Sequence, residues 1–362
     1  MIKSLCLLLL CVLTVAVPAA ELTPFDLKAN DRVVFVGDGV VERDIAYNYL
    51  ETMLTARYHG KGITFRNAGW SGDTVWGESR AVFGTQKDGY NSLIKVINET
   101  KPTVVFLCYG MNESFAGPAG LARFEEGYNA LLDNVLNPAK DAEHVAAPPA
   151  QSTNRRDPKD IAKAPPVLQR EVPRVVLVSP ITFQTEEAPA LARGGKQNEN
   201  LKLYVDAIKK IAAARGAYFA DMFSFFDGQH NQFKRGPKVQ TSDGMHLTAT
   251  GYQMYAQGME DRLGLKALNW KFEQRPGVYD SIPPTTPAPE NAAFEKLRDL
   301  IAEKNIQFFN KWRPQNETYL FLFRKHEQGK NAKEIPEFDP FIAAKEAEIA
   351  KAADDVAKGM GL

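Results

Sequence analysis

Five short apolar runs alternate along the chain with stretches in which apolar residues recur every three or four positions. The runs lie at residues 32–36, 63–65, 103–108, 174–178 and 217–220. Short continuous apolar runs are typical of strands buried on both faces, and the intervening spacing is that of amphipathic helices. Because strands that alternate with helices form parallel sheets, the sequence predicts an α/β fold with helices on both faces of the sheet.

The helical stretches can be placed from their apolar spacing and their caps. Asp44 is suited to cap a helix that carries Tyr49 and Met53 on one face. Further helices are expected over residues 121–135, 201–211 and 248–263, the second of these ended by Gly216.

Two segments break this alternation. Residues 137–173 are rich in alanine, proline and mixed charge, which indicates a surface insertion. Residues 277–289 are proline-rich, which is typical of a linker. We therefore expect a main domain over residues 24–270 and a C-terminal arm over 271–362. The arm should be helical around Phe294 and Ile301 and again over 343–358, and its many large apolar side chains should dock on the core.

The N-terminus has the pattern of a secretory signal peptide. Lys3 precedes an apolar run over residues 5–17, and small residues follow it. We expect cleavage after Ala19 and export to the periplasm or the cell exterior, because the run is too short to span a membrane. The mature chain would have no membrane span. It would keep only Cys108 of three cysteines, which excludes a disulfide framework.

Composition and motifs exclude several classes of function. Lys and Arg together number 44, as do Asp and Glu, and this balance argues against a nucleic-acid partner. Gly37 and Gly39 follow a strand, but Glu42 stands where a dinucleotide fingerprint needs its third glycine. No histidine pair has metal-ligand spacing, so we expect no metal and no cofactor.

Polar clusters follow the strands, and these clusters carry the candidate chemistry. Ligands of open parallel sheets bind at the carboxyl ends of the strands. Asp243 and His246 stand three residues apart, so the carboxylate can fix the imidazole tautomer and leave the other ring nitrogen as a general base. Gly72 and Asn112 can offer hydrogen-bond donors to an oxyanion. Together these groups point to acyl transfer.

The clusters resemble the four sequence blocks of the SGNH (GDSL-type) hydrolase superfamily over roughly residues 32–263. The resemblance implies a flavodoxin-like three-layer α/β/α fold and ester hydrolysis without a metal. The ending of the chain, near Arg313 and His326, is similar to tails on such domains in exported planctomycete proteins. The matching blocks are Gly37 and Asp38; residues 67–74 with the oxyanion-hole Gly72; residues 110–112 with Asn112; and residues 242–246 with Asp243 and His246.

One departure from the family pattern bears directly on mechanism. The family's nucleophile is the residue after Gly37 and Asp38, and here that residue is Gly39, which cannot form an acyl-enzyme. Glu113 also stands where the family usually has Asp. Three explanations remain open: another serine, Ser71 or Ser242, serves as nucleophile; His246 activates a water in the vacated space; or the domain binds its ligand without turning it over.

The side chains around the blocks suggest a ligand class. Trp70 and Trp76 bracket the second block, where their rings could stack on a sugar or simply pack the loop against the core. Asp38, Trp70 and Asp73 are the candidate ligand-binding residues. We expect a small-molecule or carbohydrate ester as the ligand, either hydrolysed by a secreted esterase or held by a non-catalytic binding or scaffolding protein.

Overall fold

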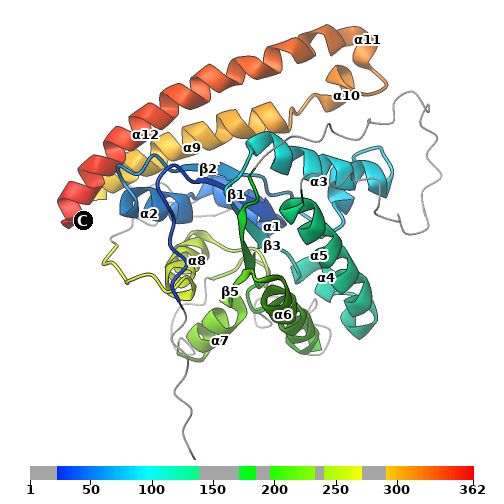
Figure 1. The fold of residues 1–362 in the computed structure, drawn as a ribbon, viewed down its shortest axis with the longest axis horizontal. Coiled ribbons are helices and arrows are strands. Elements are labelled where there is room, and N and C mark those ends of the chain that lie inside the picture. Colours follow the sequence, from blue (N-terminus) through cyan, green and yellow to red (C-terminus); the bar gives the residue numbers. More distant parts are fainter. Residues whose placement is uncertain (1–22, 138–170, 185–195, 233–239, 271–290) are drawn as a thin grey trace, which may run out of the picture.

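The computed structural model describes residues 23–137, 171–184, 196–232, 240–270 and 291–362. The expected signal peptide, most of the expected insertion and the proline-rich linker lie outside the described residues. Figure 1 shows a sheet at the centre of the molecule, with helices on both of its faces.

The sheet is parallel throughout, and its strand order is β2-β1-β3-β4-β5. Every residue of β3 is buried, as expected of the central strand. This arrangement confirms the predicted parallel α/β fold. The strands are β1 (Arg32–Gly37), β2 (Thr64–Asn67), β3 (Val104–Cys108), β4 (Arg174–Val178) and β5 (Tyr218–Ala220).

Alternate residues of each strand face two separate apolar cores. Val33 and Phe35 of β1 belong to one core, whereas Val34 and Val36 belong to the other. The first core is covered by α2 (Tyr49–Arg57), α7 (Met222–Gln232) and α8 (Ala249–Arg262). The second is covered by α3 (Gln86–Thr100), α5 (Leu121–Leu136) and α6 (Lys196–Arg215). The molecule therefore has the three layers that the family resemblance implied.

The helix expected after Asp44 is broken, and this part of the prediction is wrong. The chain forms α1 (Gly39–Arg43), the 3₁₀ turn η1 (Asp44–Ala46) and then α2. Asn48 lies between η1 and α2 with φ 57°, a left-handed conformation that interrupts a right-handed helix.

The remaining short elements are η2 (Glu78–Ala81), α4 (Met111–Ser114), η3 (Gly117–Gly120), α10 (Glu317–Leu320), α11 (Lys325–Gln328) and η8 (Gly329–Glu337).

The C-terminal region forms a helical hairpin of α9 (Ala292–Trp312) and α12 (Phe338–Met360). The two helices run side by side in opposite directions along one edge of the molecule (Figure 1). Phe294, Leu297 and Ile301 of α9 belong to the same apolar core as α2 and α8. Docking is not complete, because Phe321 and Phe323 remain 42% and 63% exposed. No described helix is both long and apolar enough to cross a membrane.

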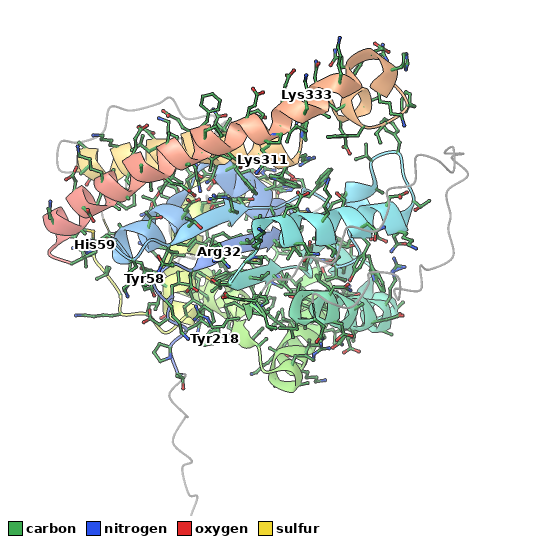
Figure 2. All side chains as sticks on the ribbon, turned by 45° about the horizontal axis from the view of Figure 1, so that its top comes forward. Arg32, Tyr58, His59, Tyr218, Lys311 and Lys333 are labelled. Carbon is green, nitrogen blue, oxygen red and sulfur yellow. The ribbon has the colours of Figure 1, made fainter. Side chains whose placement is uncertain are left out.

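Buried polar contacts also fasten the hairpin to the sheet. The ammonium of Lys304 lies 2.5 Å from a carboxylate oxygen of Glu51 and donates to the carbonyl of Phe65 in the edge strand β2 at 2.9 Å. Burial lowers the pKa of Lys304, although the neighbouring Glu51 opposes this shift. A second contact comes from α12, where the Asp354 carboxylate lies 3.2 Å from Nδ1 of His59. Figure 2 labels His59 below that helix. The hairpin therefore covers the edge of the sheet at β2. An uncovered edge strand can pair with a strand of another molecule.

Two isoleucines of α9 test whether the hairpin unfolds together with the main domain. Ile301 is fully buried, whereas Ile306 on the same helix is 51% exposed. We expect Ile301→Ala to lower the free energy of unfolding by about 2–5 kcal/mol, because it leaves a cavity in the core. Ile306→Ala should change it by less than about 0.5 kcal/mol. Urea denaturation followed by circular dichroism measures both, and equal small effects would show that the hairpin is not part of the cooperative unit.

Candidate active site

A small cavity lies at the carboxyl ends of β1 and β3. Its lining includes Asp38, Gly39, Gly72, Asn112 and His246. All four sequence blocks therefore meet at this cavity. The space open to the centre of a water molecule is about 30 Å³. A cavity needs roughly 10–15 Å³ by this measure to hold one water, so this one has room for one or two.

Asp243 and His246 form a hydrogen-bonded pair at one wall of the cavity. The Nδ1 atom of His246 lies 2.5 Å from Oδ2 of Asp243, and the other carboxylate oxygen accepts the His246 main-chain N–H at 2.9 Å. Burial acts to raise the pKa of Asp243, but the hydrogen bonds from His246 outweigh it and hold that pKa below its usual value. The carboxylate therefore occupies Nδ1, and Nε2 is left for a substrate or a water.

Gly39 leaves an open position directly in front of this histidine. The residue begins α1, and the Asp38 carboxylate caps that helix by accepting the Val40 main-chain N–H at 3.0 Å. A Cβ built on Gly39 would lie 3.6 Å from Nε2 of His246, with no closer neighbour, and the φ angle of Gly39 is not positive. The backbone therefore accepts a side chain here without strain, and the base faces the place where that side chain would be.

The two expected oxyanion donors lie on neighbouring loops that are bonded to each other. Gly72 has φ +76°, a conformation that other residues rarely adopt. The side-chain amide of Asn112 donates one hydrogen to the main-chain carbonyl of Asp73 at 2.7 Å, so one amide hydrogen remains. Glu113 strengthens the link, because its carboxyl group accepts from the N–H groups of Val75 and Gly110, each at 3.0 Å. Burial raises the pKa of Glu113 to about 8.

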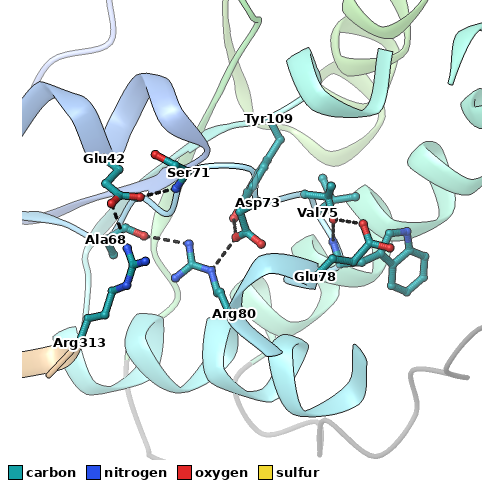
Figure 3. Close-up of polar contacts among 12 residues, drawn as sticks. Glu42, Ala68, Ser71, Asp73, Val75, Glu78, Arg80, Tyr109 and Arg313 are labelled. Atoms are coloured by element: carbon teal, nitrogen blue, oxygen red, sulfur yellow. Dashed lines mark hydrogen bonds and ion pairs between the residues drawn. The ribbon is translucent and has the colours of Figure 1, made fainter. Parts of the chain in front are cut away.

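Asp73 has a different place from the one expected. Its carboxylate is fully buried, lies 2.6 Å from Nε of Arg80 and accepts from the Tyr109 hydroxyl at 3.1 Å (Figure 3). It does not line the cavity, so it is not available to meet ligand hydroxyls there. A buried charge needs a paired partner, and Arg80 is that partner. Nothing in the sequence indicated that Arg80 is the ion-pair partner of Asp73, because Arg80 lies in a 3₁₀ turn with no local sequence signature.

Trp70 faces the C-terminal hairpin and also does not line the cavity. The guanidinium carbon of Arg313 lies 3.5 Å from the Trp70 ring centroid, and the Trp312 ring packs edge-on at 5.8 Å. Arg313 occupies a face of Trp70 that a sugar would need, which corrects the expectation that this ring stacks on the ligand. Trp76 is buried, with only 4% of its surface exposed, as the packing interpretation has it.

The two serines considered as replacement nucleophiles lie differently. The Ser242 hydroxyl donates to the main-chain carbonyl of His246 at 3.4 Å, on the side of the residue away from its ring. The Ser71 hydroxyl oxygen lies 3.7 Å from the position that a Cβ on Gly39 would occupy, beside the vacated space. Cys108 also borders the cavity, but burial raises the pKa of its thiol far above the usual range, so it is not a nucleophile.

The three-layer fold is that of an SGNH-type hydrolase, and Asp243, His246, Asn112 and Gly72 stand where the family resemblance implied. The chain belongs to the GDSL-like lipase/acylhydrolase family, whose model matches residues 35–254. No curated protein sequence matches the chain. Among the described residues, no group of three or more His, Cys, Asp or Glu side chains is arranged to hold a metal ion.

Two solved enzyme structures are among those to which the chain is similar. A gut microbial diltiazem-metabolizing enzyme aligns over 94% of this chain and 96% of its own, with a TM-score of 0.58 and 11% identity. At this identity the likeness shows the fold alone. An acetylxylan esterase from Geobacillus stearothermophilus aligns over 66% of this chain and 96% of its own, with a TM-score of 0.45 and 16% identity.

Restoring a serine at Gly39 tests whether the retained groups still form a catalytic geometry. Gly39→Ser would place a hydroxyl within reach of Nε2 of His246, without backbone strain. We expect at least about a tenfold gain in kcat/KM on 4-nitrophenyl acetate, equal to about 1.4 kcal/mol of barrier. His246→Ala in that background should abolish the gain. A correctly folded Gly39→Ser protein with no gain would contradict the geometry described here.

The buried carboxyl of Asp38 predicts how stability depends on pH. Burial raises the pKa of Asp38 from 3.8 to about 7, although the hydrogen bond from Val40 opposes the shift. Between about pH 4 and 7 the folded state keeps a proton that the unfolded state has lost, so this group makes stability fall as pH rises. Asp38→Asn keeps the helix cap but removes the titration. Its free energy of unfolding in urea should fall less than that of the wild type between about pH 4.5 and 7.5. Parallel curves would contradict the assignment.

Proposed function

We propose that the chain is an ester hydrolase for short acyl groups in which His246 activates a water in place of the missing serine. The observation that carries this proposal is the direction of Nε2, which faces the side-chain space of Gly39 while Asp243 holds the other ring nitrogen. A base acts only within about 2.6–3.2 Å of the group it deprotonates, and a water in the cavity can reach that distance.

The reaction balances without an acyl-enzyme. The water oxygen bonds to the acyl carbon as His246 takes one of its protons. The negative charge on the former carbonyl oxygen is met by the remaining Asn112 amide hydrogen and the main-chain N–H of Gly72. The bond from the acyl carbon to the alcohol oxygen then breaks, and His246 returns the proton to that oxygen. The products are a carboxylic acid and an alcohol.

The small size of the cavity, about 30 Å³, favours a short acyl group over a long one. We further propose that the alcohol part is a carbohydrate. A wider cleft of about 540 Å³ lies between α3 and the hairpin, a volume typical of ligand sites. Trp312, Phe321 and Lys101 are among its lining residues, and exposed aromatic faces beside polar groups suit sugar rings. Trp312 also contacts Trp70, next to the catalytic loop.

Hydrolysis of 4-nitrophenyl acetate and of acetylated xylo-oligosaccharide tests both parts. We expect slow turnover by the wild type that exceeds the contribution of the oxyanion hole and binding alone, which is about 10³–10⁴-fold over water when a triad member is lost. His246→Ala should lower turnover to that residual level, because it removes the base. His326→Ala, a control at a histidine whose side chain is 74% exposed, should not. Phe321→Ala should raise KM for the oligosaccharide only. Equal turnover by the wild type and His246→Ala would reject the mechanism.

A non-catalytic carbohydrate-binding or scaffolding role is the second candidate, and Gly39 is the residue that favours it. On this alternative the chain would bind acetylated oligosaccharide with no release of acetate, and His246→Ala would leave binding unchanged. Calorimetric titration together with an acetate assay on the same sample separates the two functions.

We also propose that the protein is exported. Lys3, the apolar run over residues 5–17 and the small residues up to Ala19 support cleavage at that point. N-terminal sequencing of protein from the native cell envelope should begin near Ala20. Recovery of chains that still begin at Met1 in the membrane fraction would contradict export by this route.

A further inference from the structure

Ser71 borders the same vacated space as the catalytic base. A Cβ on Gly39 would lie 3.7 Å from the Ser71 hydroxyl oxygen and 3.6 Å from Nε2 of His246. Within the described residues no direct hydrogen bond joins this hydroxyl to the histidine ring. Ser71 is not among the residues that line the cavity, but its hydroxyl and the His246 ring both lie within 4 Å of the position beside the cavity that a side chain on Gly39 would take. Two polar groups therefore flank this position, and a water there could contact both.

We infer that Ser71 is a catalytic residue that holds the attacking water together with His246. This inference rests on the proposed function and names the second group that the mechanism needs. A water that donates one hydrogen to Nε2 of His246 and the other to the Ser71 oxygen has its free lone pairs turned away from both. The lone pair that attacks the acyl carbon is then fixed in direction. Ser71 itself gains and loses no bond.

The position of Ser71 is set by contacts outside its own loop. Its main-chain N–H donates to the carboxylate of Glu42, and the other oxygen of that carboxylate accepts from Arg313 at 3.0 Å (Figure 3). Arg313 in turn stacks on Trp70, the residue before Ser71. The main chain of this solvent-exposed serine is thus held through Glu42 of α1, and Arg313 holds Glu42 in turn. A fixed main chain limits where the hydroxyl can lie, which the orientation of a water requires.

Alanine and threonine at position 71 test the role of the hydroxyl. We expect Ser71→Ala to lower kcat on 4-nitrophenyl acetate at least about tenfold with little change in KM, because the contact is made by the attacking water. Ser71→Thr keeps a hydroxyl and should retain most of the activity. In the Gly39→Ser background, where a serine replaces the water in the acylation step, Ser71→Ala should lower kcat/KM by less than about twofold.

Two further measurements give outcomes that do not depend on the size of these effects. A crystal structure of the wild type should show a water bridging Ser71 and His246, and the Ser71→Ala structure should lack it. A fluorophosphonate probe should label the Gly39→Ser protein at residue 39 and leave the wild type unlabelled.

The possible failures are distinguishable. Wild-type turnover that persists in Ser71→Ala, or a wild-type crystal without the bridging water, overturns the role of Ser71 and leaves the proposed function standing. A covalent adduct on Ser71 also overturns it, since Ser71 would then be the nucleophile. A wild type without any His246-dependent turnover rejects the proposed function, and the catalytic role of Ser71 with it.

Discussion

The buried ion pair between Asp73 and Arg80 lies where the loop after β2 meets the loop after β3. Both side chains are fully enclosed, so neither charge can exist there without the other. Arg80 also donates to the carbonyl of Ala68, and the main-chain carbonyl of Asp73 receives the Asn112 amide. These contacts together hold the loop that carries Gly72 against the loop that carries Asn112.

The C-terminal hairpin is part of this support and not an appendage. Lys304 ties it to the edge strand through the carbonyl of Phe65, and Arg313 ties its end to Glu42 beside the cavity. These contacts are polar, directional and largely buried, so they fix the position of the hairpin on the main domain as well as stabilising the fold. The loop after β2 therefore has sheet on one side and hairpin on the other, and the main-chain N–H of its Ser71 is bonded to Glu42.

Much of the fold and the central pair could be predicted from the sequence, because their signals are local. Apolar runs such as 103–108 mark buried strands by themselves, and Asp243 lies close enough in sequence to His246 to predict their contact. The sequence could not decide between stacking on a ligand and packing for Trp70, and it misplaced Asp73, for the opposite reason: their partners, Arg313 and Arg80, are chosen by tertiary packing. The break at Asn48 has no strong local signal either, since asparagine adopts the left-handed conformation only in a minority of its positions.

Replacing a nucleophilic serine by glycine has a different consequence from replacing it by a larger residue. Glycine leaves a backbone that a serine could adopt, with Asp38 capping α1 and His246 facing the open position, and it adds a small space. A serine hydroxyl is held by a covalent bond, whereas a water in its place is free to rotate. A lone base therefore does not restore the lost orientation, and a second fixed hydrogen-bonding group is the minimum needed to recover it. Ser71 is a described side chain that meets this requirement, since its oxygen lies nearly as close to the vacated position as the base does.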